Sequence, residues 1–163
     1  MDISHCSECN NNKIVKVKEN GKEFIVNNNS QKLVTKIKID NCLIIEGKRC
    51  DWLLEIDYPC SLALYIELKG KNIEQAYDQL LSTLNHSYLQ ERHKKSKKEC
   101  YIVASRVPKA GTNVQVYQAR LKQSHPEVSL KVRSMKAERL FVTCYGSIGW
   151  HKSTKSLSGK RLN

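Results

Sequence analysis

Two runs of strand-like sequence lead directly into a run with helical spacing between residues 52 and 84, and this change of period restricts the possible folds most strongly. Apolar side chains occupy alternate positions in residues 52–56 and again in residues 62–68, as expected of strands. From residue 73 the apolar positions follow the i, i+3, i+4 spacing of an amphipathic helix. Asn72 can cap that helix, with Gln75 in the capping-box position. Two joined strands followed by a helix predict an α/β domain.

Further strands and a second helix are predicted on both sides of this segment. Residues 13–26 alternate around Asn20-Gly21, a pair that favours a tight hairpin because both residues tolerate positive φ. The remaining expected elements are strands over residues 33–45, 99–105, 128–134 and 138–144 and a helix over residues 112–121. The expected fold is therefore a central mixed β-sheet flanked by helices, with an N-terminal β-hairpin.

The chain ends are expected to be less regular than its centre. The polar opening stretch up to Asn12 has no apolar period, so we expect it to be irregular. Residues 146–163 contain Gly, Ser and Lys without periodicity, which predicts a basic, flexible tail. One domain over residues 1–145 then accounts for the rest of the chain.

The formal net charge of +12 is concentrated in the second part of the chain. Met1 to Tyr88 holds 11 Lys/Arg against 12 Asp/Glu, a net of −1, whereas the remainder holds 17 against 4, a net of +13. Such asymmetry favours a polyanionic partner, nucleic acid first, although a surface that only keeps the protein soluble is the alternative. The side chains expected to contact phosphates are Arg92, Lys94, Lys95, Lys97, Lys98, Lys152 and Lys155.

Membrane insertion and disulfide bonds are not expected. No apolar run reaches the roughly 18 residues that a bilayer-spanning helix needs. The N-terminus lacks the basic-then-apolar order of a secretory signal, which predicts a cytoplasmic protein whose seven cysteines are reduced. His5, Cys6 and Cys9 form a cluster that could hold structural zinc, with Cys42 or Cys50 as a fourth ligand.

Asp51, Glu67 and Lys69 are the residues most suited to catalysis. If the two strands are antiparallel and joined around Pro59-Cys60, paired residue numbers sum to about 118 to 120, so Asp51 lies opposite Glu67 or Lys69. Side chains alternate between faces, which brings all three to the face opposite the Trp52 stripe. Two converging carboxylates suit Mg²⁺ or Mn²⁺, and a lysine beside them can stabilise charge on a phosphoryl group. The pattern therefore predicts phosphodiester hydrolysis.

The segments KRCDWLLEI and YIELKGKNIEQAYDQL resemble the core of the PD-(D/E)xK nuclease superfamily over roughly residues 33–105. This resemblance implies a restriction-endonuclease-like or Holliday-junction-resolvase-like core and a divalent-metal-dependent nuclease, with DNA favoured over RNA. It implies that Asp51 and Glu67 bind metal and that Lys69 assists the reaction. Gln79, or alternatively Gln75, is implied to reach the site from the helix. Cutting both strands of a duplex would favour a homodimer.

The third acidic ligand and the activity itself are open at this point. Members of the superfamily usually begin with a helix that carries a glutamate, and no such helix is predicted here. Glu46 is the chosen replacement, with Asp40 and Glu55 as alternatives. Lys69 could instead form a simple cross-strand ion pair with Asp51. The chain could also be an inactive nuclease-fold module that binds nucleic acid or a nucleoprotein partner.

Overall fold

The computed structural model describes residues 2–56, 61–69, 71–106 and 112–140, with side chains of the last range from Val114 onward. The strands are β1 (Ser7–Asn10), β2 (Ile14–Glu19), β3 (Lys22–Asn27), β4 (Val34–Lys38), β5 (Trp52–Ile56), β6 (Leu62–Lys69), β7 (Lys97–Ala104), β8 (Ser129–Ser134) and β9 (Lys136–Leu140). The helices are the short 3-10 helix η1 (Ser4–Cys6), α1 (Ile73–Leu84), α2 (Ser87–Arg92) and α3 (Thr112–Ser124).

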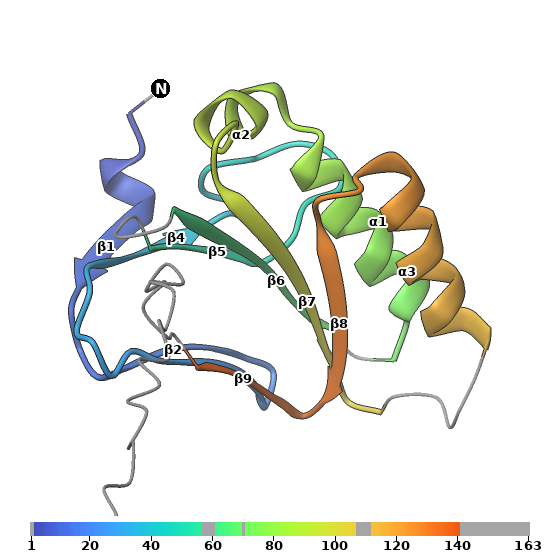
Figure 1. The fold of residues 1–163 in the computed structure, drawn as a ribbon, viewed down its shortest axis with the longest axis horizontal. Helices are drawn as coiled ribbons and strands as arrows, with labels where there is room; N and C mark the ends of the chain where they lie inside the picture. The colour runs from blue at the N-terminus through green and yellow to red at the C-terminus, as the bar shows by residue number, and fades with distance from the viewer. Residues whose placement is uncertain (1, 57–60, 70, 107–111, 141–163) are drawn as a thin grey trace, which may run out of the picture.

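A mixed six-stranded sheet with the order β1-β4-β5-β6-β7-β8 forms the centre of the molecule (Figure 1). Its first four strands are antiparallel neighbours, whereas β6, β7 and β8 run parallel. Parallel neighbours need a crossover connection, and the helices lie in the two crossovers: α1 and α2 between β6 and β7, and α3 between β7 and β8. The prediction of an α/β fold with a mixed sheet is confirmed.

The central sheet is covered on both faces by different layers. Helices α1 and α3 pack on one face, and the three-stranded sheet β2-β3-β9 lies across the other (Figure 1). Alternation along the strands divides the core accordingly: Leu53 and Tyr65 belong to the helix-side cluster, whereas Leu54 and Leu64 belong to the cluster on the other side. Residues Leu62 to Leu68 of β6 are all buried, because this strand is covered on both faces.

The three-stranded sheet joins distant parts of the sequence. Strands β2 and β3 pair antiparallel through a turn in which Asn20 and Gly21 both have positive φ. Strand β9 then pairs parallel with β3, beginning with Glu23 opposite Lys136. The ring centroids of Phe24 and Tyr101 are 4.5 Å apart, which links this sheet to the central one.

Two expectations for the N-terminal segment are wrong. The stretch before Asn12 is ordered into η1 and β1, because β1 pairs antiparallel with β4 and completes the sheet edge. Cys6 and Cys42, which were expected to be free thiols, form a disulfide bond with a Cα–Cα distance of 5.7 Å. The pairing of β1 with β4 brings these cysteines together across 36 residues of sequence. Residues 141–145 of the predicted domain and the predicted tail lie outside the described residues.

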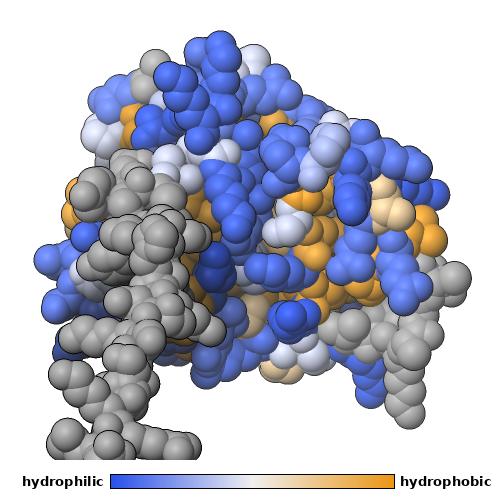
Figure 2. Space-filling view, in the orientation of Figure 1, coloured by the Kyte–Doolittle hydropathy of each residue, from blue (hydrophilic) through white to orange (hydrophobic). Residues whose placement is uncertain are grey.

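Hydrophilic side chains gather over α2 at one end of the molecule, and hydrophobic surface is visible over the region of β8 and α3 (Figure 2). Val116 of α3 and Met135 after β8 are among the exposed hydrophobic residues. Within the described ranges, no helix is long and apolar enough to cross a membrane.

Candidate active site

Asp51 and Glu67 meet at one end of the β5–β6 strand pair. Trp52 pairs with Ile66, so paired residue numbers sum to 118, as the sequence predicts. One step further along, this register sets Asp51 opposite Glu67. Both residues share the face occupied by Leu53 and Tyr65, which is the face covered by α1. Two carboxylates therefore converge under a helix.

Asp51 lies directly before β5, and both its side chain and its backbone carbonyl accept hydrogen bonds. Its Oδ2 accepts a hydrogen bond from the backbone N–H of Leu68 at 2.6 Å, while its own carbonyl accepts from the N–H groups of Ile39 and Asp40 at 3.0 and 3.4 Å. The side chain is 7% exposed. Burial raises the pKa of Asp51 to about 6, against the opposing effect of the Leu68 hydrogen bond.

Glu67 is the most deeply buried acid of the site, with 1% of its surface exposed. Its Oε1 lies 3.7 Å from Lys69 Nζ, and its Oε2 is buried without a hydrogen-bond partner among the described residues. Burial and, secondly, the charge of Asp51 raise the pKa of Glu67 to about 8. A buried carboxylate oxygen without a donor is costly, so ionised Glu67 lacks a partner for Oε2 among the described residues.

Lys69 ends β6 on the same face as Glu67 and keeps 27% of its side chain exposed. Its ion pair is with Glu67, not with Asp51 as the cross-strand alternative required. Helix α1 begins only four residues later, where Asn72 Oδ1 accepts from Gln75 N at 2.9 Å. The N-terminus of a helix favours anions, and this one follows Lys69 closely in the chain.

Helix α1 fixes the backbone that leads into Asp51. Gln79 Nε2 donates to the carbonyl of Arg49 at 2.8 Å, and one turn along, Thr83 Oγ1 accepts from Cys50 N at 2.8 Å. Gln79 Oε1 is buried without a hydrogen-bond partner in the described part of the chain. Gln79 therefore holds the strand that carries Asp51, whereas the alternative Gln75 is exposed and serves the helix cap.

The three candidates for a third acid lie in different surroundings. Glu46 is exposed in the irregular segment before β5. Asp40 forms an ion pair with Arg49 at 2.6 Å, and its charge contributes to the raised pKa of both Asp51 and Glu67. Glu55 lies four positions along β5 from Asp51 and is paired there with other residues. Of the three, only Asp40 interacts with the site.

Two further residues form the edge of the site and were not identified from the sequence. Lys38 Nζ lies 3.1 Å from Glu19 Oε2 at the turn between β2 and β3, and both charges act on Asp51. Lys38 ends β4, one step beyond the pairing partner of Leu53. Its position at a strand end next to Asp51 is the signal that could have revealed it.

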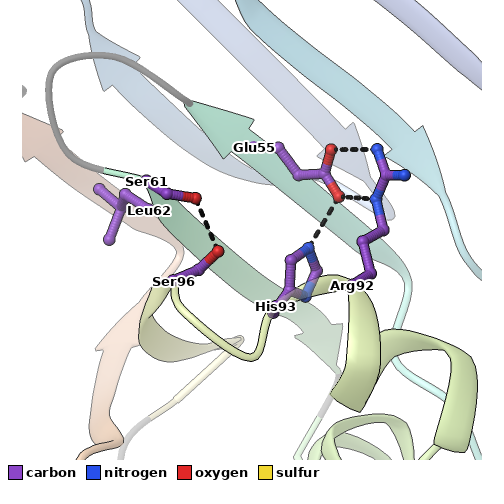
Figure 3. Close-up of a pocket in the computed structure, with 6 residues that line it drawn as sticks. All are labelled: Glu55, Ser61, Leu62, Arg92, His93 and Ser96. Carbon is purple, nitrogen blue, oxygen red and sulfur yellow. Dashed lines mark hydrogen bonds and ion pairs between the residues drawn. The ribbon is translucent and has the colours of Figure 1, made fainter.

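A second buried acid, Glu55, lies at the opposite end of β5 (Figure 3). Arg92 donates to both of its carboxylate oxygens, at 2.6 and 2.7 Å. His93 Nε2 lies 2.8 Å from Glu55 Oε1, and His93 Nδ1 lies 2.6 Å from the hydroxyl of Tyr65. Burial opposes ionisation, but the hydrogen bonds from Arg92 and His93 prevail and lower the pKa of Glu55 to about 2.

The Glu55 cluster borders a cavity of about 160 Å³. Ser61 and Ser96 also line it, and their hydroxyl oxygens are 2.6 Å apart (Figure 3). Both nitrogens of His93 are engaged by Tyr65 and Glu55, so neither serine is activated by this histidine. The cluster is a satisfied structural network.

The basic segment expected to contact phosphates lies far from Asp51 and Glu67. Strands β6 and β7 are parallel, with Leu62 opposite Lys97 and Lys69 opposite Ala104. The two ends of β6 are therefore about 20 Å apart at roughly 3.3 Å per residue. Among the expected contacts, Arg92 is bound to Glu55, Lys94 pairs with Glu91 at 3.8 Å, and Lys97 pairs with Glu99 at 3.7 Å.

Two of the other expected phosphate contacts, Lys95 and Lys98, lie within the described residues. Lys95 is exposed and Lys98 is half-buried in β7. Lys152 and Lys155 fall outside the described residues. The basic end of β7 could therefore meet only a part of a nucleic acid that lies well away from Asp51 and Glu67.

The proposed zinc ligands are only partly brought together. The ligand atoms of His5, Cys6 and Cys42 lie within 4.8 Å of one another. Cys9 is exposed, with its sulfur 3.3 Å from Thr35 Oγ1, and does not belong to this group. Cys50 is buried in the helix-side core. Cys42, which was one of two alternatives for the fourth ligand, is thus a direct neighbour of His5.

Comparison with protein-family models, with curated proteins and with solved structures found no match for this chain. Function must therefore be inferred from the chemistry of the site itself.

Proposed function

We propose that the protein is a divalent-metal-dependent nuclease that hydrolyses phosphodiester bonds, with DNA as the expected substrate. One observation carries this proposal: Asp51 and Glu67 converge beside Lys69, and Glu67 Oε2 is buried without a donor within the described residues. A structural ion pair would satisfy its acids, as the Glu55 cluster does. A buried acid with an unsatisfied oxygen is typical of a binding or catalytic site.

The residues of the site fit a hard divalent cation. Asp51 and Glu67 offer carboxylate oxygens on two rigid, paired strands, which is the donor type that Mg²⁺ and Mn²⁺ prefer. Asp51 uses Oδ2 to hold the backbone of Leu68, which fixes the carboxylate in place. Asp51 and Glu67 would hold the ion, which supplies polarisation of a phosphoryl oxygen and activation of a water molecule when bound.

Lys69 and the N-terminus of α1 would act on the scissile phosphate, and Gln79 would hold the site in place. The ammonium group of Lys69 can donate to the attacking water or to a phosphoryl oxygen as negative charge develops. Gln79 keeps the start of β5 in place through its bond to the Arg49 carbonyl, so its role is positioning. The N-terminus of α1 adds a positive electrostatic potential close to Lys69 in the chain.

The order of elements supports the same proposal. Strands β4, β5 and β6 are consecutive antiparallel neighbours, α1 follows, and β7 adds parallel to β6. The resemblance to the PD-(D/E)xK superfamily implies this order: an acid on one strand, E-x-K on the next, then a helix and a further strand. Asp51 directly precedes β5, and Glu67 and Lys69 lie on β6, which supports the proposal.

A cleavage assay with purified protein tests the proposal. Supercoiled plasmid, linear duplex, single-stranded DNA and single-stranded RNA are each incubated with Mg²⁺ or Mn²⁺. We expect cleavage of at least one DNA substrate, lost on chelation. Asp51→Asn, Glu67→Gln and Lys69→Met should each reduce the rate by about 100-fold or more, because each removes a charge that acts on the transition state.

Matched controls are available on the same molecule. Asp78→Asn and Lys48→Met each remove one charge of the exposed Lys48–Asp78 ion pair and should leave the rate within about twofold of wild type. If folded wild-type protein leaves every substrate intact with both metals, the proposal is wrong. Binding without cleavage would support the inactive nucleic-acid-binding module instead.

A further inference from the structure

A second group of potential ligands lies where the N-terminal segment meets the turn after β4. Cys6 ends η1 and is buried, whereas Cys42 is half-buried in the turn. The exposed His5 lies beside them, and its imidazole nitrogen and the two sulfur atoms lie within 4.8 Å of one another. These are one nitrogen and two sulfur donors, the combination that zinc prefers over Mg²⁺ or Mn²⁺.

The three ligands border a pocket of about 250 Å³, which Trp52 also lines. The exposure of His5 means that an ion could reach the group without opening the core. In a tetrahedral site with Zn–S bonds of roughly 2.3 Å, two sulfur ligands lie about 3.8 Å apart. The ligand atoms of His5, Cys6 and Cys42 lie within 4.8 Å of one another, so small side-chain rotations in the reduced protein would bring them to this geometry.

The backbone around both cysteines is held independently of the disulfide bond. Ser7, which follows Cys6, pairs with Ile37 of β4. The turn that carries Cys42 is fixed by Arg49, which donates to Asp40 Oδ1 at 2.6 Å and to Asn41 Oδ1 at 2.5 Å. Reduction of the disulfide would therefore leave the two thiols close together and beside His5.

We propose that His5, Cys6 and Cys42 form a redox-dependent zinc site, in which the disulfide bond and the zinc complex are alternative states of the same cysteines. In the oxidised state the S–S bond removes both sulfur ligands. A dithiol reductant breaks this bond, gives two electrons and two protons to the cysteines, and is itself oxidised to a disulfide. Zn²⁺ then binds two thiolates and the imidazole and releases the two thiol protons, with water in the open position.

This site is independent of the proposed nuclease chemistry. The cysteine sulfurs and imidazole nitrogen are soft or borderline donors, whereas Asp51 and Glu67 offer only oxygen. The zinc test therefore uses a background with Asp51→Asn and Glu67→Gln, so that failure of either proposal is recognised separately. Cys60 and Cys144, which lie outside the described residues, are replaced by serine in the same background.

The experiment compares the oxidised protein with protein reduced by a phosphine, which becomes a phosphine oxide while water supplies the oxygen and the thiol protons. Co²⁺ is used as a spectroscopic probe because thiolate ligation gives an intense ultraviolet charge-transfer band. We expect the band only after reduction, at one Co²⁺ per chain, and displaced by Zn²⁺. Cys42→Ser should lower Zn²⁺ affinity by about 100-fold and His5→Ala by about 10-fold.

Cys9→Ser is the matched control, since this exposed cysteine lies three residues from Cys6 but outside the ligand group. It should bind Zn²⁺ as tightly as its parent. The proposal is overturned if reduced protein gives no thiolate band, or if Cys42→Ser leaves the affinity unchanged. It is also overturned if Cys6 and Cys42 are freely alkylated before reduction, which would show that no disulfide competes with the metal.

Discussion

Buried acids lie at both ends of β5, on the same face of the sheet, yet their surroundings are opposite. Glu55 is satisfied by Arg92 and His93, and its pKa falls to about 2. At the other end, the pKa of Glu67 opposite Asp51 rises to about 8, and one of its oxygens lacks a donor within the described residues. Burial disfavours ionisation at both ends, so the difference comes from the partners.

This difference separates an acid whose ionised form is stabilised by the fold from two acids whose ionised form is disfavoured. At the Glu55 end, the acid joins α2 to the sheet through charge-assisted hydrogen bonds. At the Asp51 and Glu67 end, the raised pKa values mean that ionising the two acids reduces stability. Substitutions at the two ends should consequently change stability in opposite directions.

The largest expected effect is the loss of stability in Glu55→Ala. Arg92 and His93 would lose their common acceptor, and removing one member of a buried ion pair costs about 3 kcal/mol of unfolding free energy. Urea unfolding monitored by circular dichroism measures this change. Glu91→Ala removes an exposed partner of Lys94 and should cost about 0.5 kcal/mol or less. Equal effects in both variants would contradict the assignment of Glu55 as a structural acid.

The second largest effect is expected on the unfolding free energy at low pH. Because the folded pKa of Glu55, about 2, lies below its ordinary value of 4.5, its contribution is complete above about pH 5 and is lost as the pH falls towards 2. The difference in unfolding free energy between wild type and Glu55→Gln should therefore shrink by about 2 kcal/mol between pH 6 and pH 2. If the difference in unfolding free energy stays constant over this range, Arg92 and His93 do not lower the pKa of Glu55.

Glu67→Gln should have the opposite sign and stabilise the protein without metal. The raised folded pKa of Glu67 means that wild type loses stability as the pH rises from about 5 through 8. Replacing the acid with a neutral amide should raise the melting temperature at pH 9 by about 3 °C, or about 1 kcal/mol, as followed by scanning fluorimetry. Glu74→Gln, on the exposed side of α1, should leave it unchanged. If Glu67→Gln is less stable than wild type, Glu67 stabilises the fold in the same way as Glu55.

The smallest expected effect is stabilisation by Mg²⁺. At a concentration three times its dissociation constant, a ligand that binds only the folded state adds about 0.8 kcal/mol. This gain should be seen in wild type and in Glu55→Gln, but not in Glu67→Gln, when melting temperatures are compared with and without the ion. If Mg²⁺ still raises the melting temperature of Glu67→Gln, the ion binds at a different place on the protein.

The register of β5 and β6 could be predicted because it depends on local features. Alternating side chains and a short connection restrict the possible pairings, and the observed sum of 118 falls within the expected range. The helix after Asn72 was equally predictable, since its cap and apolar stripe are encoded within a dozen residues. These two features are sufficient to bring Asp51, Glu67 and Lys69 onto one face.

The partners of Glu55 could not be predicted in the same way. Arg92 was interpreted as a phosphate contact because its segment is strongly basic, but the position of α2 over the sheet directs it to Glu55. The Cys6–Cys42 bond depends likewise on the pairing of β1 with β4, and β1 has no apolar period that reveals it. Contacts between distant segments are decided by packing, which a single sequence does not display.

The parallel pairing of β3 with β9 has a consequence for synthesis of the chain on the ribosome. Strands β2 and β3 emerge early and can form their hairpin at once, but one edge of β3 has no partner until residues 136–140 are translated. An exposed strand edge is a site where nascent chains associate with one another. Slow translation between β3 and β9 should therefore lower the yield of native protein more than slow translation after β9.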